Sequence, residues 1–241
     1  MAALLDRLIF EILAKVGCVA PPVDAIQLAK RMGMVVLQDA RLQGRARRVR
    51  LSVGDGDRTV AAVYLRPEPR AERRQWAVAH ELGEHFAPEV LAALDIKPDE
   101  ATPERREQSA HAFAERLLLP QPWLLREGAA CDWDLPRLKN CFSTASHELI
   151  ARRVVVCLSD AVVTIVDDGR IHARHDAQGR RPPLLREERT LIAKCRASGA
   201  PCERFVSGVH LRCWPIHEVE HRREILLTQA GEQVGTPGYD E

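Results

Sequence analysis

Residues 73–87 are apolar on almost every side of a helix, which is the pattern of a helix buried inside a domain. Pro88 follows this stretch and is expected to end the helix, because proline lacks the backbone N–H that would bond to a carbonyl of the preceding turn. Gly83 lies in the middle, where glycine is about 1 kcal/mol less favourable than alanine. The sequence therefore predicts a covered helix that another backbone, or a substrate, approaches closely at Gly83.

The same helix carries the polar run H-E-L-G-E-H over residues 80–85. In the zinc-protease pattern H-E-x-x-H, two histidines four residues apart bind one metal ion, and the first glutamate moves protons. Here the spacing is one residue too long, because His85 lies about 140° around the helix from His80. Either Glu84, at the four-residue position, replaces the second histidine, or a one-residue π-bulge brings His85 into line. We favour Glu84, because the sequence offers no signal for a bulge.

A second cluster, at residues 217–221, spells H-E-V-E-H and matches the protease pattern letter by letter. Pro215 lies two residues before it, and the apolar spacing upstream is typical of a strand or a loop. The tail that follows holds few carboxylates and no helix-sized segment that would supply a third ligand. We therefore interpret His217 and His221 as ordinary surface histidines.

A second predicted helix supplies further candidate ligands. Thr102 and Pro103 are the residue types of an N-cap and a first helical position, and the helix is expected to run to about Leu119. Glu107 and His111 are four residues apart and so share one face of this helix. Glu107 is a candidate third ligand, whereas His111 is either a fourth ligand or a hydrogen-bond partner of a ligand.

Four side chains from the two helices make up the predicted metal site: His80, Glu84, Glu107 and His111. His85 is the alternative to Glu84, and Glu81 is the predicted base. Mixed imidazole and carboxylate ligands suit Zn²⁺, which is the leading choice, and they also suit Mn²⁺ or Fe²⁺. Two carboxylates would cancel the charge of the ion and make it a weaker acidifier of bound water.

Two segments of the chain together resemble the paired signature of the ImmA/IrrE-type metallopeptidases. They are residues 74–83, R-Q-W-A-V-A-H-E-L-G, and residues 107–120, E-Q-S-A-H-A-F-A-E-R-L-L-L-P. Upstream, residues 26–33 resemble the helix, glycine and strand with which the family opens. The similarity spans roughly residues 20–125.

The resemblance implies a small gluzincin-like domain, in which His80 and Glu107 would match metal ligands and Glu81 would match the general base. The chain departs from the family pattern at two positions. Glu84 stands where the second zinc histidine is usual, and His111 stands where asparagine or aspartate is usual.

The resemblance also implies a function in gene regulation, since many such proteins cleave helix-turn-helix repressors and so switch on stress-response or mobile-element genes. We therefore expect a cytoplasmic, zinc-dependent metalloendopeptidase whose protein substrate is such a repressor. The alternative is a non-catalytic metallopeptidase-like regulator that binds a repressor or another protein. Glu81 favours the enzyme, because a structural metal site needs no base, whereas Glu84 favours the regulator.

Composition agrees with a cytoplasmic protein. The 241 residues are 46% hydrophobic, and no apolar run approaches the roughly 18 residues that span a membrane. No signal peptide is evident, and the seven scattered cysteines form no C-x-x-C pair, so reduced thiols are expected. The net charge of +1 gives no general attraction to nucleic acid. The arginine run at residues 45–50 is interpreted as solvated, with an acidic partner or a substrate groove as the alternatives.

The chain is predicted to be an α+β protein in three segments. Residues 1–125 form a zincin-like helical metallopeptidase domain with a small sheet. Residues 126–158 form a helical linker segment whose two short helices could be a helix-turn-helix, although simple packing is the favoured interpretation and direct nucleic-acid binding is not expected. Residues 159–241 form a small α+β domain that senses a signal or selects the substrate.

Local patterns predict individual elements within these segments. Strands are expected at residues 34–37 and 60–65 in the first segment. In the last segment, Asp168 and Gly169 predict the turn of a β-hairpin, and residues 186–197 predict a helix.

Overall fold

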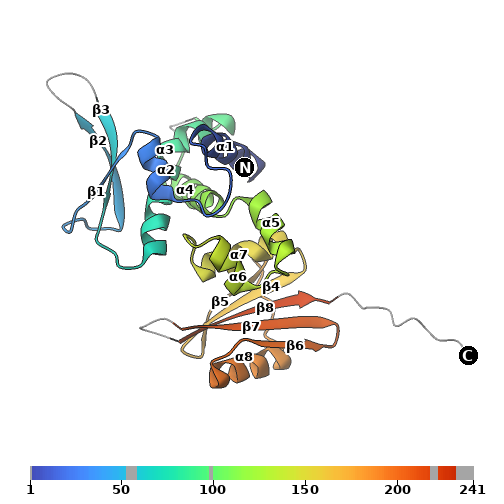
Figure 1. Cartoon of the computed structure of the whole chain (residues 1–241). Coiled ribbons are helices and arrows are strands. Elements are labelled where there is room, and N and C mark those ends of the chain that lie inside the picture. The colour runs from blue at the N-terminus through green and yellow to red at the C-terminus, as the bar shows by residue number, and fades with distance from the viewer. Residues whose placement is uncertain (1, 53–58, 98–99, 218–221, 232–241) are drawn as a thin grey trace, which may run out of the picture. The chain divides into compact units, whose positions relative to one another are not determined.

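In the computed structural model, the described residues are 2–52, 59–97, 100–217 and 222–231. The chain divides into two compact units, residues 1–150 and 151–241. Within the described ranges it contains eight helices and two small sheets, so the predicted α+β class is confirmed (Figure 1). No helix in these ranges is both long enough and apolar enough to cross a membrane.

The first unit is mainly helical, and the helix that follows Thr102 begins where the sequence predicts. The Asp24 carboxylate accepts a hydrogen bond from the Gln27 amide at 2.9 Å, and the Thr102 hydroxyl accepts one from the Arg105 amide at 3.3 Å. The last helix of the unit continues past residue 150. The helices are α1 (Ala2–Lys15), α2 (Ala25–Arg31), α3 (Ala71–Ala93), α4 (Pro103–Leu118), α5 (Gln121–Ala130), α6 (Leu135–Cys141) and α7 (His147–Cys157).

Helix α3 is longer than the sequence predicts. It continues past Pro88 to Ala93, so the expectation that Pro88 ends it is wrong. Proline removes one backbone hydrogen bond, but Val90 and Leu91 beyond it are buried, and this burial stabilises the extra turns. Since every position of the element is α-helical, no π-bulge moves His85 onto the face of His80.

A three-stranded sheet with the order β1-β3-β2 completes the first unit. The sequence predicts β1 (Val35–Gln38) and β3 (Thr59–Leu65), which pair in parallel. It does not predict β2 (Ala46–Ser52), which contains most of the arginine run that was interpreted as solvated. Strand β2 pairs antiparallel with β3 and lies at the edge of the sheet. Helix α3 packs against β2 and β3, which brings its polar run close to this edge strand.

The second unit is an antiparallel sheet with the order β5-β4-β8-β7-β6, and helix α8 packs on it. The predicted hairpin turn is confirmed, because Asp168 and Gly169 have φ values of 48° and 82° between paired strands. The predicted helix is confirmed as α8. The elements are β4 (Ala161–Asp167), β5 (Arg170–Asp176), α8 (Arg186–Ser198), β6 (Cys202–Val206), β7 (Val209–His217) and β8 (Arg222–Ala230).

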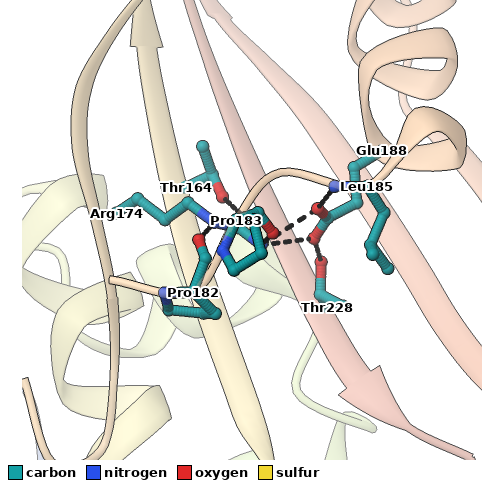
Figure 2. A network of polar contacts seen from close by, with 7 residues as sticks. All are labelled: Thr164, Arg174, Pro182, Pro183, Leu185, Glu188 and Thr228. Carbon is teal, nitrogen blue, oxygen red and sulfur yellow. Dashed lines mark hydrogen bonds and ion pairs between the residues drawn. The ribbon is translucent and has the colours of Figure 1, made fainter. Parts of the chain in front are cut away.

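A buried polar network joins the strands of the second unit to α8 (Figure 2). The Arg174 guanidinium donates to both carboxylate oxygens of Glu188, at 3.1 and 2.9 Å, and the two side chains are 7% and 0% exposed. Arg174 also donates to the Thr164 hydroxyl, and the Thr228 hydroxyl donates to Glu188. Both buried charges are thus paired, and the pair connects β5 to the first turn of α8.

Candidate metal centre

Helices α3 and α4 touch through their backbones at Gly83. A β-carbon at this position would lie 2.7 Å from the carbonyl oxygen of Ala110, closer than such atoms approach. The expectation that a backbone passes close to Gly83 is therefore confirmed. Phe86 and Phe113 stack nearby, with ring centroids 5.6 Å apart. This close packing fixes the faces of the two helices that carry the polar side chains.

Three side chains gather where these helices meet: His80 from α3, and Glu107 and His111 from α4. The His80 Nε2 atom lies 3.5 Å from Glu107 Oε2, and His111 Nε2 lies 2.9 Å from Glu107 Oε1. One potential ligand atom from each residue lies within 4.8 Å of the other two. The His111 ring also contacts the rings of Trp76 and His80 edge-on, at centroid distances of 5.5 and 5.0 Å. We call these three residues the His80 group, and they can hold a metal ion.

The members of the His80 group differ in exposure. The His80 side chain is 19% exposed, whereas those of Glu107 and His111 are 58% and 51% exposed. Burial lowers the pKa of His80, and the charge of Glu107 opposes this shift. The neutral imidazole is the form that binds a metal ion, so burial favours the ligand form of His80.

The donor set fits a metal ion. Two imidazole nitrogens and one carboxylate oxygen are a three-ligand set that leaves a fourth tetrahedral position open for water or substrate. The exposure of Glu107 and His111 gives solvent access to the group. The buried His80 Nδ1 atom has no hydrogen-bond partner among the described residues, whereas a metal-bound histidine usually donates from its second ring nitrogen to a carboxylate, a carbonyl or water.

Glu81 follows His80 on α3 and reaches strand β2. Its Oε2 atom accepts a hydrogen bond from the backbone amide of Arg48 at 2.7 Å. Burial raises the pKa of the Glu81 carboxyl, the Arg48 amide opposes this shift, and the charges of Glu84 and Glu107 add to it. A partly buried carboxyl with a raised pKa, next to a potential metal ligand, has the properties of a group that exchanges protons.

Sequence reasoning did not identify Arg48 as a partner of Glu81, because the contact uses a backbone N–H that every residue except proline carries. The Arg45 carbonyl accepts from the Arg66 amide at 3.0 Å, so the pairing with β3 directs the backbone groups of Ala46, Arg48 and Arg50 away from that strand. One signal for β2 was available. Val49 and Leu51 alternate with arginines in the run, which is the period of a strand.

Glu84 and His85 are not members of the His80 group. The charge of Glu84 still acts on His80 and on Glu81, so Glu84 lies near the group without contributing a ligand atom to it. Burial lowers the pKa of His85, and the positive charges of Arg48 and Arg50 act in the same direction. His85 therefore lies within reach of the charges of β2 and does not join His80.

His217, the first residue of the second histidine cluster, lies in a strand and not at the start of a helix. His217 is the last residue of β7, is exposed, and pairs with Arg222 of β8. The sequence expectation of a strand or loop before this cluster is thus confirmed. His221 and the three residues before it lie outside the described residues.

Comparisons with known proteins bear on the fold. No family model matches the chain, and no curated protein matches it. Among solved structures, a chain described as a Mycobacterium tuberculosis transcriptional regulator is similar, with a TM-score of 0.63 and 14% sequence identity. The match covers 94% of this chain and 75% of that chain. At this level of identity the likeness shows a shared fold.

Proposed function

We propose that the protein is a metal-dependent endopeptidase of the gluzincin-like, ImmA/IrrE type, with Zn²⁺ bound by His80, Glu107 and His111. The observation that carries the proposal is the His80 group itself, three potential ligand atoms within 4.8 Å of one another. Glu81 lies next to His80 in the sequence and supplies the base that a purely structural ion does not need. Mn²⁺ and Fe²⁺ are compatible with the same donors.

The chemistry divides between the ion and the chain. A bound Zn²⁺ polarises the substrate carbonyl and acidifies water. Glu81 takes the proton of the attacking water and delivers it to the leaving amine. Burial raises the pKa of Glu81, so its carboxylate accepts a proton more readily than that of a solvated glutamate.

Strand β2 supports a peptide as the substrate. It lies at the edge of the sheet, and the backbone groups of Ala46 and Arg50 point away from β3. Groups of this kind bind an extended peptide by adding a strand to the sheet, and on β2 the Arg48 amide between them is bonded to Glu81. Since Glu81 contacts Arg48 on this same strand, a peptide bound along β2 would pass the proposed base.

A helix-turn-helix repressor in the cytoplasm is the proposed substrate. The resemblance of residues 74–83 and 107–120 to the ImmA/IrrE signature supports this choice. The shared fold with a chain described as a transcriptional regulator is compatible with a role in gene control.

The test is to incubate the purified protein and Zn²⁺ with a repressor encoded beside its gene, and to follow cleavage by mass spectrometry. Glu81→Gln should reduce the rate about 10²–10⁴-fold, the usual contribution of a general base. Glu89→Gln is the matched control, because Glu89 is an exposed glutamate on the same helix. Equal cleavage by the wild type and by Glu81→Gln would contradict the assignment of the base.

One observation favours a second candidate, a non-catalytic regulator that binds a repressor or another protein. The Glu81 carboxylate is already bonded to the Arg48 amide, so its role could be to join α3 to β2. In that case the wild type would bind the repressor without cutting it under Zn²⁺, Mn²⁺ or Fe²⁺. Glu81→Gln would then lower the free energy of unfolding while leaving binding unchanged.

A further inference from the structure

A cavity of about 280 Å³ lies in the first unit beside the start of α3. Its walls come from the first two turns of that helix, from the end of β3 and the segment that follows it, and from the two residues that precede β2. The charged residues that line it are Arg45, Arg66, Glu68, Arg73 and Arg74. Four arginines against one glutamate make this a positively charged cavity.

The single carboxylate of the cavity is already engaged. Glu68 accepts from the Arg70 amide at 3.0 Å, and its second oxygen lies 3.5 Å from the Arg73 guanidinium. Arg74 donates to the Glu68 backbone carbonyl rather than to a carboxylate. Glu68 therefore balances about one of the four positive charges.

Two of the arginines are available to a ligand. Neither Arg45 nor Arg66 makes an ion pair with any residue in the described ranges, both side chains are exposed, and the charge of Arg45 acts on Glu68 without direct contact. Guanidinium groups bind carboxylates through paired, charge-assisted hydrogen bonds. The chemistry of the cavity thus selects an anion, and its volume admits the end of a side chain.

The cavity lies near the contact between Glu81 and β2, because its lining residues precede both Glu81 and Arg48 by a few positions. Ala77, which also lines it, precedes Glu81 by one turn of α3, a rise of about 6 Å. Arg45 precedes Arg48 by three residues of extended chain, about 10 Å. An extended peptide spans these distances with two or three residues.

We propose that this cavity binds an acidic side chain of the substrate, two or three residues from the bond that is cleaved. The inference rests on the proposed peptidase function for the identity of the ligand as a peptide, and it adds a specificity for Asp or Glu at one position. Arg45 and Arg66 are the residues that recognise the acidic side chain at this position. A peptide C-terminal carboxylate has the same chemistry and is distinguished by experiment.

The probe is a library of internally quenched decapeptides, in which each position in turn is fixed as Glu or as Gln, with free or amidated C-termini. Cleavage of these peptides by the zinc-loaded wild type gives kcat/KM for every position. Anisotropy of the same peptides, labelled and mixed with the Glu81→Gln variant, gives affinity without cleavage. The variants are Arg45→Gln and Arg66→Gln, with Arg41→Gln as the control, because Arg41 is exposed and does not line the cavity.

Glu should be preferred over Gln at one position by about tenfold, as a hydrogen bond between charged groups provides. Arg45→Gln and Arg66→Gln should each abolish most of this preference, and Arg41→Gln should keep it. A preference that persists in the Arg45→Gln, Arg66→Gln double variant would overturn the inference. A difference in kcat/KM that depends on a free peptide C-terminus, and not on Glu at one position, would also overturn the inference.

The two readouts separate this inference from the function on which it rests. Cleavage with no preference for Glu at any position would leave the peptidase and remove the acidic specificity. Glu-dependent anisotropy that Arg66→Gln abolishes, without cleavage under any metal, would keep the cavity as a peptide-binding site and contradict the peptidase.

Discussion

The buried network of the second unit and the His80 group of the first unit use similar residues and satisfy them differently. Arg174 and Glu188 are almost fully buried, and they bond to each other, to hydroxyls and to backbone groups. Glu107 and His111 are more than half exposed, and their potential ligand atoms face those of His80. A closed network of paired charges stabilises the fold, whereas an open one retains donor atoms for a ligand. The buried network and the His80 group therefore differ in how completely their polar atoms are hydrogen-bonded, and not in their residue types.

The largest change in the free energy of unfolding is expected from a substitution in the buried network of the second unit. Arg174→Met leaves Glu188 buried without its positive partner, which should lower the free energy of unfolding by about 3–5 kcal/mol. Chemical denaturation measures this loss. Arg180→Met is the control, because Arg180 is 75% exposed and its pair with Asp176 should contribute much less than the buried pair. Equal losses of unfolding free energy in the two variants would show that the buried pair stabilises the protein no more than the exposed pair. Zinc affinity should not change in either.

Through the His80 group, the stability of the protein should instead depend on added metal. Zn²⁺ at a hundred times its Kd should stabilise the wild type by about 2.7 kcal/mol, because it binds the folded state. Glu107→Gln removes a ligand and should lose most of this gain, as followed by the shift of Tm with added zinc. Glu115→Gln, a glutamate of the same helix outside the His80 group, should keep it. A zinc-dependent Tm shift that survives in Glu107→Gln would remove Glu107 from the site.

The helix contact beneath the His80 group links packing to metal binding. Gly83→Ala places a methyl group against the Ala110 backbone, so α3 and α4 must separate. This overpacking should lower the free energy of unfolding by about 1–3 kcal/mol and weaken zinc binding, because His80 moves away from Glu107. Gly44→Ala should do neither, since the nearest atom to an added β-carbon there is 3.7 Å away. Unchanged zinc affinity in Gly83→Ala would show that the ligands do not depend on this contact.

Local signals predicted much of this structure. The Thr102 cap fixed the start of α4 and hence the shared face of Glu107 and His111, and Asp168 and Gly169 fixed the hairpin of the second unit. Elements that depend on distant contacts were missed. Helix α3 continues past Pro88 because the burial of the residues after it outweighs the loss of one hydrogen bond. The sequence around Pro88 contains no pattern that would predict this burial.

The edge strand and the buried network illustrate the same limit. Arginines on β2 have the composition of a solvated loop, and the strand exists because β3 pairs with it. The contact of Arg48 with Glu81 uses a backbone atom, which leaves no trace in residue identity. Arg174 and Glu188 are polar residues without a local pattern, and their partnership depends on how β5 and α8 pack.

Substitution of Glu84 should cause the smallest change, a small loss of zinc affinity. In the sequence it occupies the position of the second ligand, but in the structure it acts on the His80 group only through its charge. Glu84→Gln should therefore weaken zinc binding less than about tenfold, as expected for a nearby charge in a partly solvated setting. His111→Ala, measured beside it by competition with a zinc chelator, should weaken binding far more, because it removes a donor atom. If the two variants lose the same affinity, Glu84 is a ligand and α3 rearranges when the metal binds.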